Sequence, residues 1–170
     1  MKKIYFDYAA TSIKRKKILE DILENADKFD GNPDSSHSFG REAKKILEEA
    51  RGKIAKSINA NPSQIIFTSG ASESNNTVLS AFADKKIITT NIEHDSIENT
   101  YKPENTILLE IDEYTNILDA LKAKLTDEIK LVSIMMVNNE TGLILPIKEI
   151  GEFLKDRDVY FHVDCVQAYG

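Results

Sequence analysis

The chain has 170 residues, of which 41% are hydrophobic and 29% are charged, so it can bury a substantial core and is not a disordered tail. Its formal net charge is -6, and an acidic chain does not attract the negatively charged backbone of a nucleic acid, so we expect no nucleic-acid partner. A single cysteine excludes an internal disulfide framework, and no apolar run is long enough to span a bilayer, so we expect a cytoplasmic protein without a membrane segment.

The N-terminal part of the chain has the apolar periodicity of helices. Apolar side chains recur at helical spacing from Ile18 to Ala26 and again from Ala43 to Ile58. Between these stretches the sequence GNPDSSHSFG collects turn-forming residues and predicts an ordered or semi-ordered loop. We therefore expect two amphipathic helices joined by this loop.

Short apolar runs separated by helical segments follow the turn at Asn61 and Pro62. This alternation predicts an α/β protein with a mostly parallel sheet and helices on both faces. Ligands of such sheets bind at the carboxyl ends of the strands, so the residues after each run are the candidates for a functional site. The expected strands are residues 65–68, 87–90, 106–109, 131–137 and 159–163.

The first expected strand leads into the sequence SGASES and then into a helix. Ala71 and Ser72 would lie at the helix start, where small side chains allow a close approach and free N–H groups attract an anion. This pattern predicts a phosphate site, but not the glycine and lysine spacing of dinucleotide or nucleoside triphosphate sites. The alternative is an ordinary helix start in which Ser72 is the cap and Asn75 or Asn76 is exposed to solvent.

Two further strand ends carry an imidazole and amides. His94 lies just past the second expected strand, where its ring could stack on a planar group, transfer a proton, or simply cap the next helix. Asn138 and Asn139 follow residue 137; amides supply hydrogen-bond donors without charge, and they are also ordinary turn residues. At each position both interpretations stay open.

The last expected strand ends in a carboxylate. Asp164 directly follows Val163, and Gln167 lies three positions later. An unpaired buried carboxylate is unfavourable, so a cation should meet Asp164, and a protonated heteroaromatic nitrogen would suit it. Together the four strand ends predict a pocket for a phosphorylated, nitrogen-containing aromatic ring, and pyridoxal 5′-phosphate (PLP) meets all four demands. The scattered histidines show no metal-ligand spacing, and His162, inside the strand, is expected to be a core residue.

Six motifs occur in a specific order between about residue 4 and residue 170: YFDYAATS, GNPDSSHSFG, IIFTSGASESNN, NIEHDSI, VSIMMVNNETG and YFHVDCVQAYG. In this order they resemble the cysteine desulfurases (NifS/IscS-like), class V aminotransferases of fold type I. The resemblance implies conversion of L-cysteine to L-alanine and an enzyme-bound persulfide, a sulfur-acceptor protein for iron–sulfur cluster or thio-cofactor synthesis, and a homodimer. The alternatives are a selenocysteine lyase or another class V transferase, and a non-catalytic PLP-binding or interaction module.

The resemblance also implies a role for each candidate residue on the phosphate and substrate side. Ala71 and Ser72 would bind the cofactor phosphate through the helix start. His94 would stack on the pyridine ring and transfer protons, which makes it the candidate catalytic residue. Asn139 would lie beside the ring oxygen and the substrate.

On the other side of the ring, the resemblance implies that Asp164 pairs with the pyridinium nitrogen. This pairing would keep the nitrogen protonated, so that the ring can act as an electron sink. Gln167 would hydrogen-bond the phenolic oxygen. The family carries its sulfur-accepting cysteine on a later loop, so Cys165 is expected to have no catalytic role.

The resemblance finally predicts an incomplete large domain. Residues 1–15 would form an N-terminal segment, and residues 16–170 would form part of the PLP-binding large domain. The family's covalent cofactor lysine, loop cysteine, substrate-binding arginine and small C-terminal domain lie beyond residue 170. We therefore expect a fragment that binds PLP at most non-covalently and does not turn over cysteine alone. Residues 65–68 would lack sheet neighbours, so we expect a rearranged sheet, a swapped or self-associated oligomer, or dependence on a missing segment.

Overall fold

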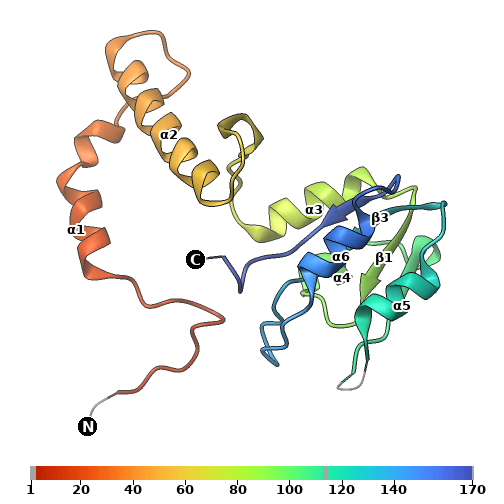
Figure 1. Cartoon of the computed structure of the whole chain (residues 1–170). Coiled ribbons are helices and arrows are strands. Elements are labelled where there is room, and N and C mark those ends of the chain that lie inside the picture. The colour runs from red at the N-terminus through yellow and green to blue at the C-terminus, as the bar shows by residue number, and fades with distance from the viewer. Residues whose placement is uncertain (1–2, 113–114, 170) are drawn as a thin grey trace. The chain divides into compact units, whose positions relative to one another are not determined.

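A computed structural model describes residues 3–112 and 115–169. The chain divides into two compact units, Met1–Phe67 and Thr68–Gly170, and Figure 1 shows the course of the chain through both. The expected domain from residue 16 to residue 170 stays a prediction. Among the described residues, no helix has both the length and the apolar character needed to cross a membrane.

The first unit contains the two expected helices. The loop between them is ordered: the backbone N–H of Ser35 donates to the carbonyl of Asn32 at 2.9 Å, and a Cβ on Gly40 would lie 2.3 Å from the Ser35 carbonyl oxygen. Only glycine allows this close approach. The elements are α1 (Lys16–Glu24), η1 (Ala26–Phe29), α2 (Ser38–Ser57) and η2 (Pro62–Gln64).

The amphipathic pattern of α1 is present without a buried face. Ile18 and Ile22 are each 51% exposed, and Leu23 is 75% exposed. The periodicity therefore predicted the helix correctly, but the described residues of this unit do not form the apolar surface that would cover it.

Residues 65–68 pair with none of the described strands, so the strand prediction was wrong, whereas the expected lack of sheet neighbours is confirmed. Ile66 is 83% exposed. The Arg51 guanidinium donates to the carbonyl of Ile65, and its carbon lies 4.8 Å from the ring centroid of Phe67. Extended backbone becomes a strand only when a neighbour offers a ladder of hydrogen bonds, and here a side chain takes that place.

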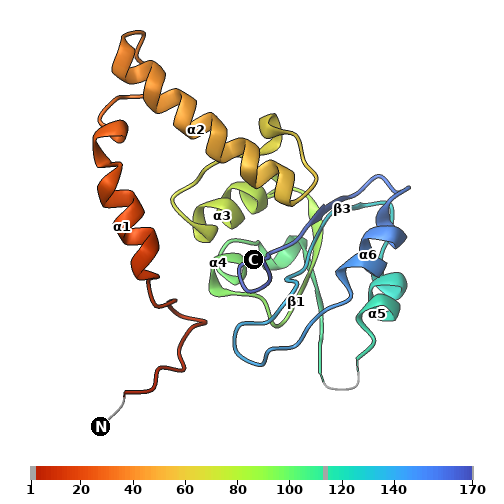
Figure 2. The same ribbon diagram turned by 60° about the vertical axis from the view of Figure 1, so that its left-hand side comes forward.

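The second unit is an α/β fold with a four-stranded parallel sheet in the order β2-β1-β3-β4. This architecture confirms the predicted sheet with helices on both faces; Figure 2 shows α3 and α4 on one side of the sheet and α5 and α6 on the other. The elements are α3 (Ala71–Ala81), β1 (Lys86–Thr90), α4 (Asp95–Glu98), η3 (Pro103–Asn105), β2 (Thr106–Leu109), α5 (Ile117–Lys124), β3 (Ile129–Ser133), α6 (Ile147–Leu154) and β4 (Tyr160–His162).

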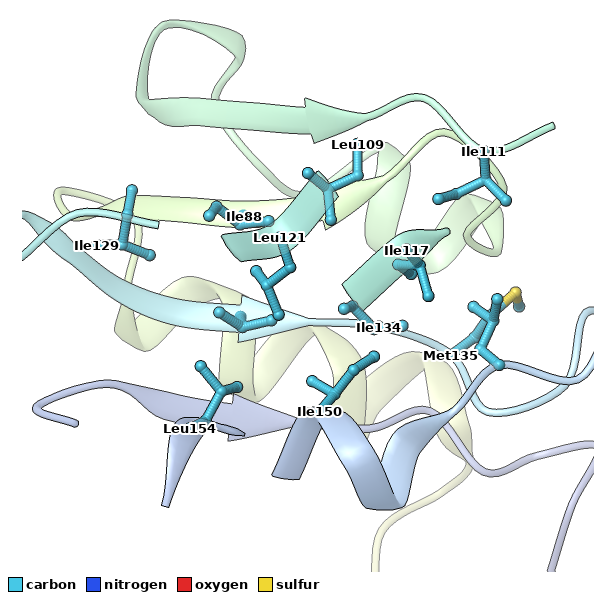
Figure 3. Close-up of a cluster of buried hydrophobic side chains, with 12 residues drawn as sticks. Ile88, Leu109, Ile111, Ile117, Leu121, Ile129, Ile134, Met135, Ile150 and Leu154 are labelled. Atoms are coloured by element: carbon cyan, nitrogen blue, oxygen red, sulfur yellow. The ribbon is translucent and has the colours of Figure 1, made fainter. Parts of the chain in front are cut away.

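Successive side chains of β1, one of the two central strands, pack on opposite faces of the sheet. Ile87 is buried against Leu79 of α3 and Ile97 of α4. The next residue, Ile88, belongs to the larger cluster under α5 and α6. Because strand side chains alternate, a strand buried on both faces is apolar at consecutive positions. Figure 3 shows the larger cluster, which includes Leu109, Ile117, Leu121, Ile129, Ile134, Ile150 and Leu154.

The strand predicted for residues 131–137 is shorter than expected, because β3 ends at Ser133. The backbone still follows β4 for three residues: the Ile134 N–H donates to the His162 carbonyl at 3.1 Å, and the Met136 N–H donates to the Asp164 carbonyl at 2.9 Å. Val137 then forms an isolated antiparallel bridge with Ile144. At Val137 the backbone thus pairs with the segment that returns at Ile144 and no longer with β4.

Candidate functional site at the strand ends

Asp164 lies immediately past β4 and is only 7% exposed. Its Oδ2 accepts a hydrogen bond from the Asn75 side-chain amide at 2.8 Å, and its Oδ1 accepts one from the Val166 N–H at 2.9 Å. Neutral donors hold the carboxylate, and within the described part of the chain no cationic side chain forms an ion pair with it. Each oxygen retains a free lone pair, so the carboxylate can accept a further donor.

Asn75 connects Asp164 to the loop after β1. Its side-chain nitrogen also donates to the Ser96 hydroxyl at 3.0 Å, and that hydroxyl lies 2.9 Å from Nδ1 of His94. Since Ser96 accepts from Asn75, its own proton is available to His94, whose Nδ1 also accepts the Ser96 backbone N–H at 3.1 Å. Nδ1 is therefore an acceptor, and we assign the proton of the neutral ring to Nε2.

His94 itself is an exposed residue at the N-terminal cap of α4. The interpretation of His94 as a helix cap is thus confirmed. Its stacking and proton-transfer roles stay predictions, and its exposed ring leaves them open. The hydrogen bonds at Nδ1 fix the ring orientation and leave Nε2–H as the free polar edge.

A cavity of about 400 Å³ lies between the loops that follow β1 and β3, and both His94 and Asn139 line it. The two adjacent amides behave differently. Asn138 is a turn residue: its nitrogen donates to the Ile92 carbonyl at 2.8 Å, and its oxygen accepts from the Thr141 N–H at 2.8 Å. The Asn139 amide makes no hydrogen bond to any described residue, so it is the one available for a ligand.

The start of α3 differs from the capping arrangement considered above. The cap is Gly70, which has no side chain, so the interpretation of Ser72 as the cap was wrong. Glu73 instead reaches back and accepts from the Ser69 N–H at 2.7 Å and the Ser69 hydroxyl at 2.6 Å. These hydrogen bonds lower the pKa of Glu73. The N–H groups of Ala71 and Ser72 lie in the first turn, where the helix provides no acceptor.

The segment after Asp164 turns tightly. The N–H of Ala168 donates to the carbonyl of Cys165 at 2.9 Å, which places the half-buried Gln167 within the turn. Burial and the nearby Asp164 raise the pKa of the Cys165 thiol, so Cys165 is protonated at neutral pH.

His162, the last residue of β4, forms a hydrogen bond of 2.9 Å with the Ser133 hydroxyl, and burial lowers the pKa of the imidazole. The expected structural role of His162 is confirmed.

Sequence reasoning missed three residues of this site: Asn75, Ser96 and Glu93. The sequence pattern predicts that Asn75 or Asn76 is exposed to solvent. Asn75 is instead 3% exposed and lies on the buried face of α3, four positions before Leu79. That spacing from an apolar residue is the signal that could have identified it. Glu93 had a weaker signal, since it adjoins His94, and Ser96 had none.

Comparison with known proteins identifies the family of this chain. The sequence model of the aminotransferase class-V family matches residues 4–170. The chain belongs to the class-V aminotransferase family. The resemblance to cysteine desulfurases, inferred from the six motifs, is confirmed by the relatives of this chain. A cysteine desulfurase IscS of Clostridium botulinum (strain Kyoto / Type A2) is 42% identical over 182 residues, which cover 99% of this chain and 46% of that protein.

A cysteine desulfurase IscS of Dictyoglomus turgidum is 41% identical over 187 residues, again 99% of this chain and 46% of the relative. A solved NifS-like protein superposes with a TM-score of 0.85 at 32% identity and covers 96% of this chain and 49% of its own. The structure of SspA in complex with cysteine gives a TM-score of 0.83 at 30% identity, with 96% and 51% covered. The chain therefore spans about half the length of the relatives that it matches.

Replacing Asn75 with alanine is expected to lower the free energy of unfolding by about 1–3 kcal/mol, because buried Asp164 loses a donor. The matched control is Asn76→Ala, which removes an exposed amide from the adjacent position of the same helix. Urea unfolding of both variants at pH 7 measures the difference. Equal losses in the two variants would contradict the assigned role of Asn75.

Proposed function

We propose that this chain carries the PLP-binding residues of a cysteine desulfurase, an enzyme that converts L-cysteine to L-alanine and an enzyme-bound persulfide. One observation carries the proposal: Asp164 is a buried carboxylate that only neutral donors hold, at the strand end where the sheet's ligand would lie. A protonated ring nitrogen would supply the missing positive charge.

The other described residues suit the remaining parts of PLP. The N–H groups of Ala71 and Ser72, at the start of α3 where Gly70 offers no side-chain cap, would receive the phosphate. This helix start lies one turn from Asn75, which contacts Asp164 directly, so phosphate and ring-nitrogen sites belong to the same edge of the sheet. Small residues at positions 70 and 71 leave room for the phosphate oxygens.

His94, Asn139 and Gln167 would complete the site around the ring. When bound, PLP supplies an electron sink for negative charge that develops on the substrate. Asp164 would hold the proton on the ring nitrogen. His94 presents Nε2–H, and the hydrogen bonds that Ser96 makes at Nδ1 hold the imidazole in one orientation.

The amides would orient the ring by its oxygen. Asn139, whose side chain has no hydrogen-bond partner among the described residues, would donate to the phenolic oxygen on the cavity side. Gln167 would do so from the turn after Asp164. The L-cysteine substrate, the sulfur-acceptor protein, the homodimer, the cytoplasmic location and the absence of covalent cofactor attachment stay predictions for this chain.

The proposal is tested by equilibrium binding of 4′-deoxypyridoxine 5′-phosphate, a PLP analogue without the aldehyde, so that reaction with surface lysines cannot mimic binding. We expect saturable binding at one site per chain by calorimetry. The same compound without its phosphate should bind at least about tenfold more weakly, because the phosphate interacts with the start of α3. Absence of saturable binding, or equal affinity for both compounds, would overturn the proposed function.

A further inference from the structure

Glu93 joins the carboxyl ends of the two central strands. It is 6% exposed and lies between β1 and His94. Its Oε1 accepts a hydrogen bond from the Thr90 hydroxyl at 2.6 Å and another from the Met135 backbone N–H at 3.0 Å. Thr90 is the last residue of β1, and Met135 follows β3, so one carboxyl oxygen links two adjacent strands just before they enter the site.

The other carboxyl oxygen of Glu93 has no partner. Oε2 is buried and makes no hydrogen bond to any described residue. An ionised carboxylate would leave this oxygen negatively charged without a donor, which is strongly unfavourable. A neutral acid lowers this cost, because Oε1 can accept both hydrogen bonds as a carbonyl while Oε2 carries an uncharged O–H group.

The charges around Glu93 favour the same neutral state. Asp164, after β4, and Glu98, in α4, are the negative groups that face it. Burial first, and these two carboxylates second, raise the pKa of Glu93 to about 7, while its hydrogen bonds from Thr90 and Met135 act in the opposite direction. Glu93 therefore changes from neutral to charged in the physiological pH range.

We propose that Glu93, as a neutral acid, is a positioning residue that holds the strand ends carrying His94 and Asn139 and adds no second negative charge near Asp164. His94 is the next residue after Glu93, and Asn139 lies four positions past Met135, so the link fixes both loops that line the cavity. Ionisation of Glu93 would leave Oε2 charged without a donor and place a second negative charge near Asp164, and both effects favour a rearrangement of the linked strand ends. This inference rests on the proposed function.

Affinity for 4′-deoxypyridoxine 5′-phosphate, measured at pH 6 and pH 8.5, tests the inference. Glu93→Gln imitates the neutral acid and should bind within about twofold of the unmodified chain at pH 6. At pH 8.5 the unmodified chain should bind about tenfold more weakly than Glu93→Gln, because most Glu93 is then ionised. Glu93→Ala, which loses both hydrogen bonds, should bind weakly at both pH values. The control Glu104→Gln, at an exposed carboxylate, should follow the unmodified chain.

A second measurement needs no ligand. Carbon NMR of the Glu93 carboxyl group should show a titration midpoint near 7, and the Met135 amide signal should shift with the same midpoint. A midpoint near 4.5 would overturn the inference, as would parallel pH profiles of affinity for the unmodified chain and Glu93→Gln. Failure of every variant to bind the analogue would overturn the proposed function instead, while the NMR midpoint would still decide whether Glu93 is held neutral.

Discussion

Asp164→Asn is expected to weaken the binding of 4′-deoxypyridoxine 5′-phosphate by about 100-fold at pH 7. The substitution removes the negative charge that stabilises a protonated ring nitrogen in a site shielded from water, where opposite charges interact strongly. Asp164 is 7% exposed, so water cannot replace the lost charge. Calorimetry gives the affinity, and the ultraviolet spectrum of the bound ring reports whether its nitrogen is protonated.

The matched control is Asp127→Asn, which removes the same charge from an exposed residue of the same unit and should leave the affinity unchanged. An amide at position 164 must direct a donor at Asn75 or Val166, so some loss of stability is expected, and circular dichroism must first show that the variant is folded. Equal affinities of the two variants, in folded protein, would rule out an ion pair between Asp164 and the ring.

The free energy of unfolding is expected to fall by about 3 kcal/mol as the pH rises from 4.5 to 7, through the titration of Glu93 alone. Its pKa is about 7 in the folded chain, against an ordinary value of 4.5. Between these values the folded state binds the proton and the unfolded state does not, so stability decreases as the proton is lost. The penalty is absent below pH 4.5 and complete above about pH 7.

Other groups also titrate over this range, so the useful quantity is the difference between the unmodified chain and Glu93→Gln. Urea unfolding at intervals between pH 5 and pH 8 should show the variant gaining on the unmodified chain by most of those 3 kcal/mol. The amide has no proton to lose, and it retains the oxygen that accepts from Thr90 and Met135. A difference that stays constant with pH would show that Glu93 titrates normally.

Local periodicity predicted most of the second unit because its strands are buried on both faces and its helices on one. Ile87 and Ile88 illustrate the point, since their consecutive apolar side chains pack under opposite helix layers. Residues 65–68 have the same apolar character, but a strand also needs a partner, and local sequence does not contain that information. For the same reason the sequence could not show that β3 would end at Ser133.

The candidate site divides in a similar way. Positions that follow strands, such as His94 and Asp164, could be located from the sequence because parallel strands bring their carboxyl ends to one edge. The spacing from Leu79 could have placed Asn75 on the buried face of α3, but its partner Asp164 lies 89 positions later and could not be found from local sequence. The state of Glu93 likewise depends on Thr90, Met135 and two carboxylates from other segments, and only the folded arrangement brings them together.

The hydrogen bond between Asn75 and Asp164 has a consequence for the order in which the chain folds. It closes a loop of 89 residues, and Asp164 reaches its position only after β4 has joined β3. Long loops of this kind form late, since their closure must wait for intervening segments to collapse. During synthesis on the ribosome, Asn75 would emerge long before Asp164 and would donate to water until that partner arrived. A ligand that needs Asp164 would therefore bind only chains whose last strand had docked, and would select them from incompletely folded ones.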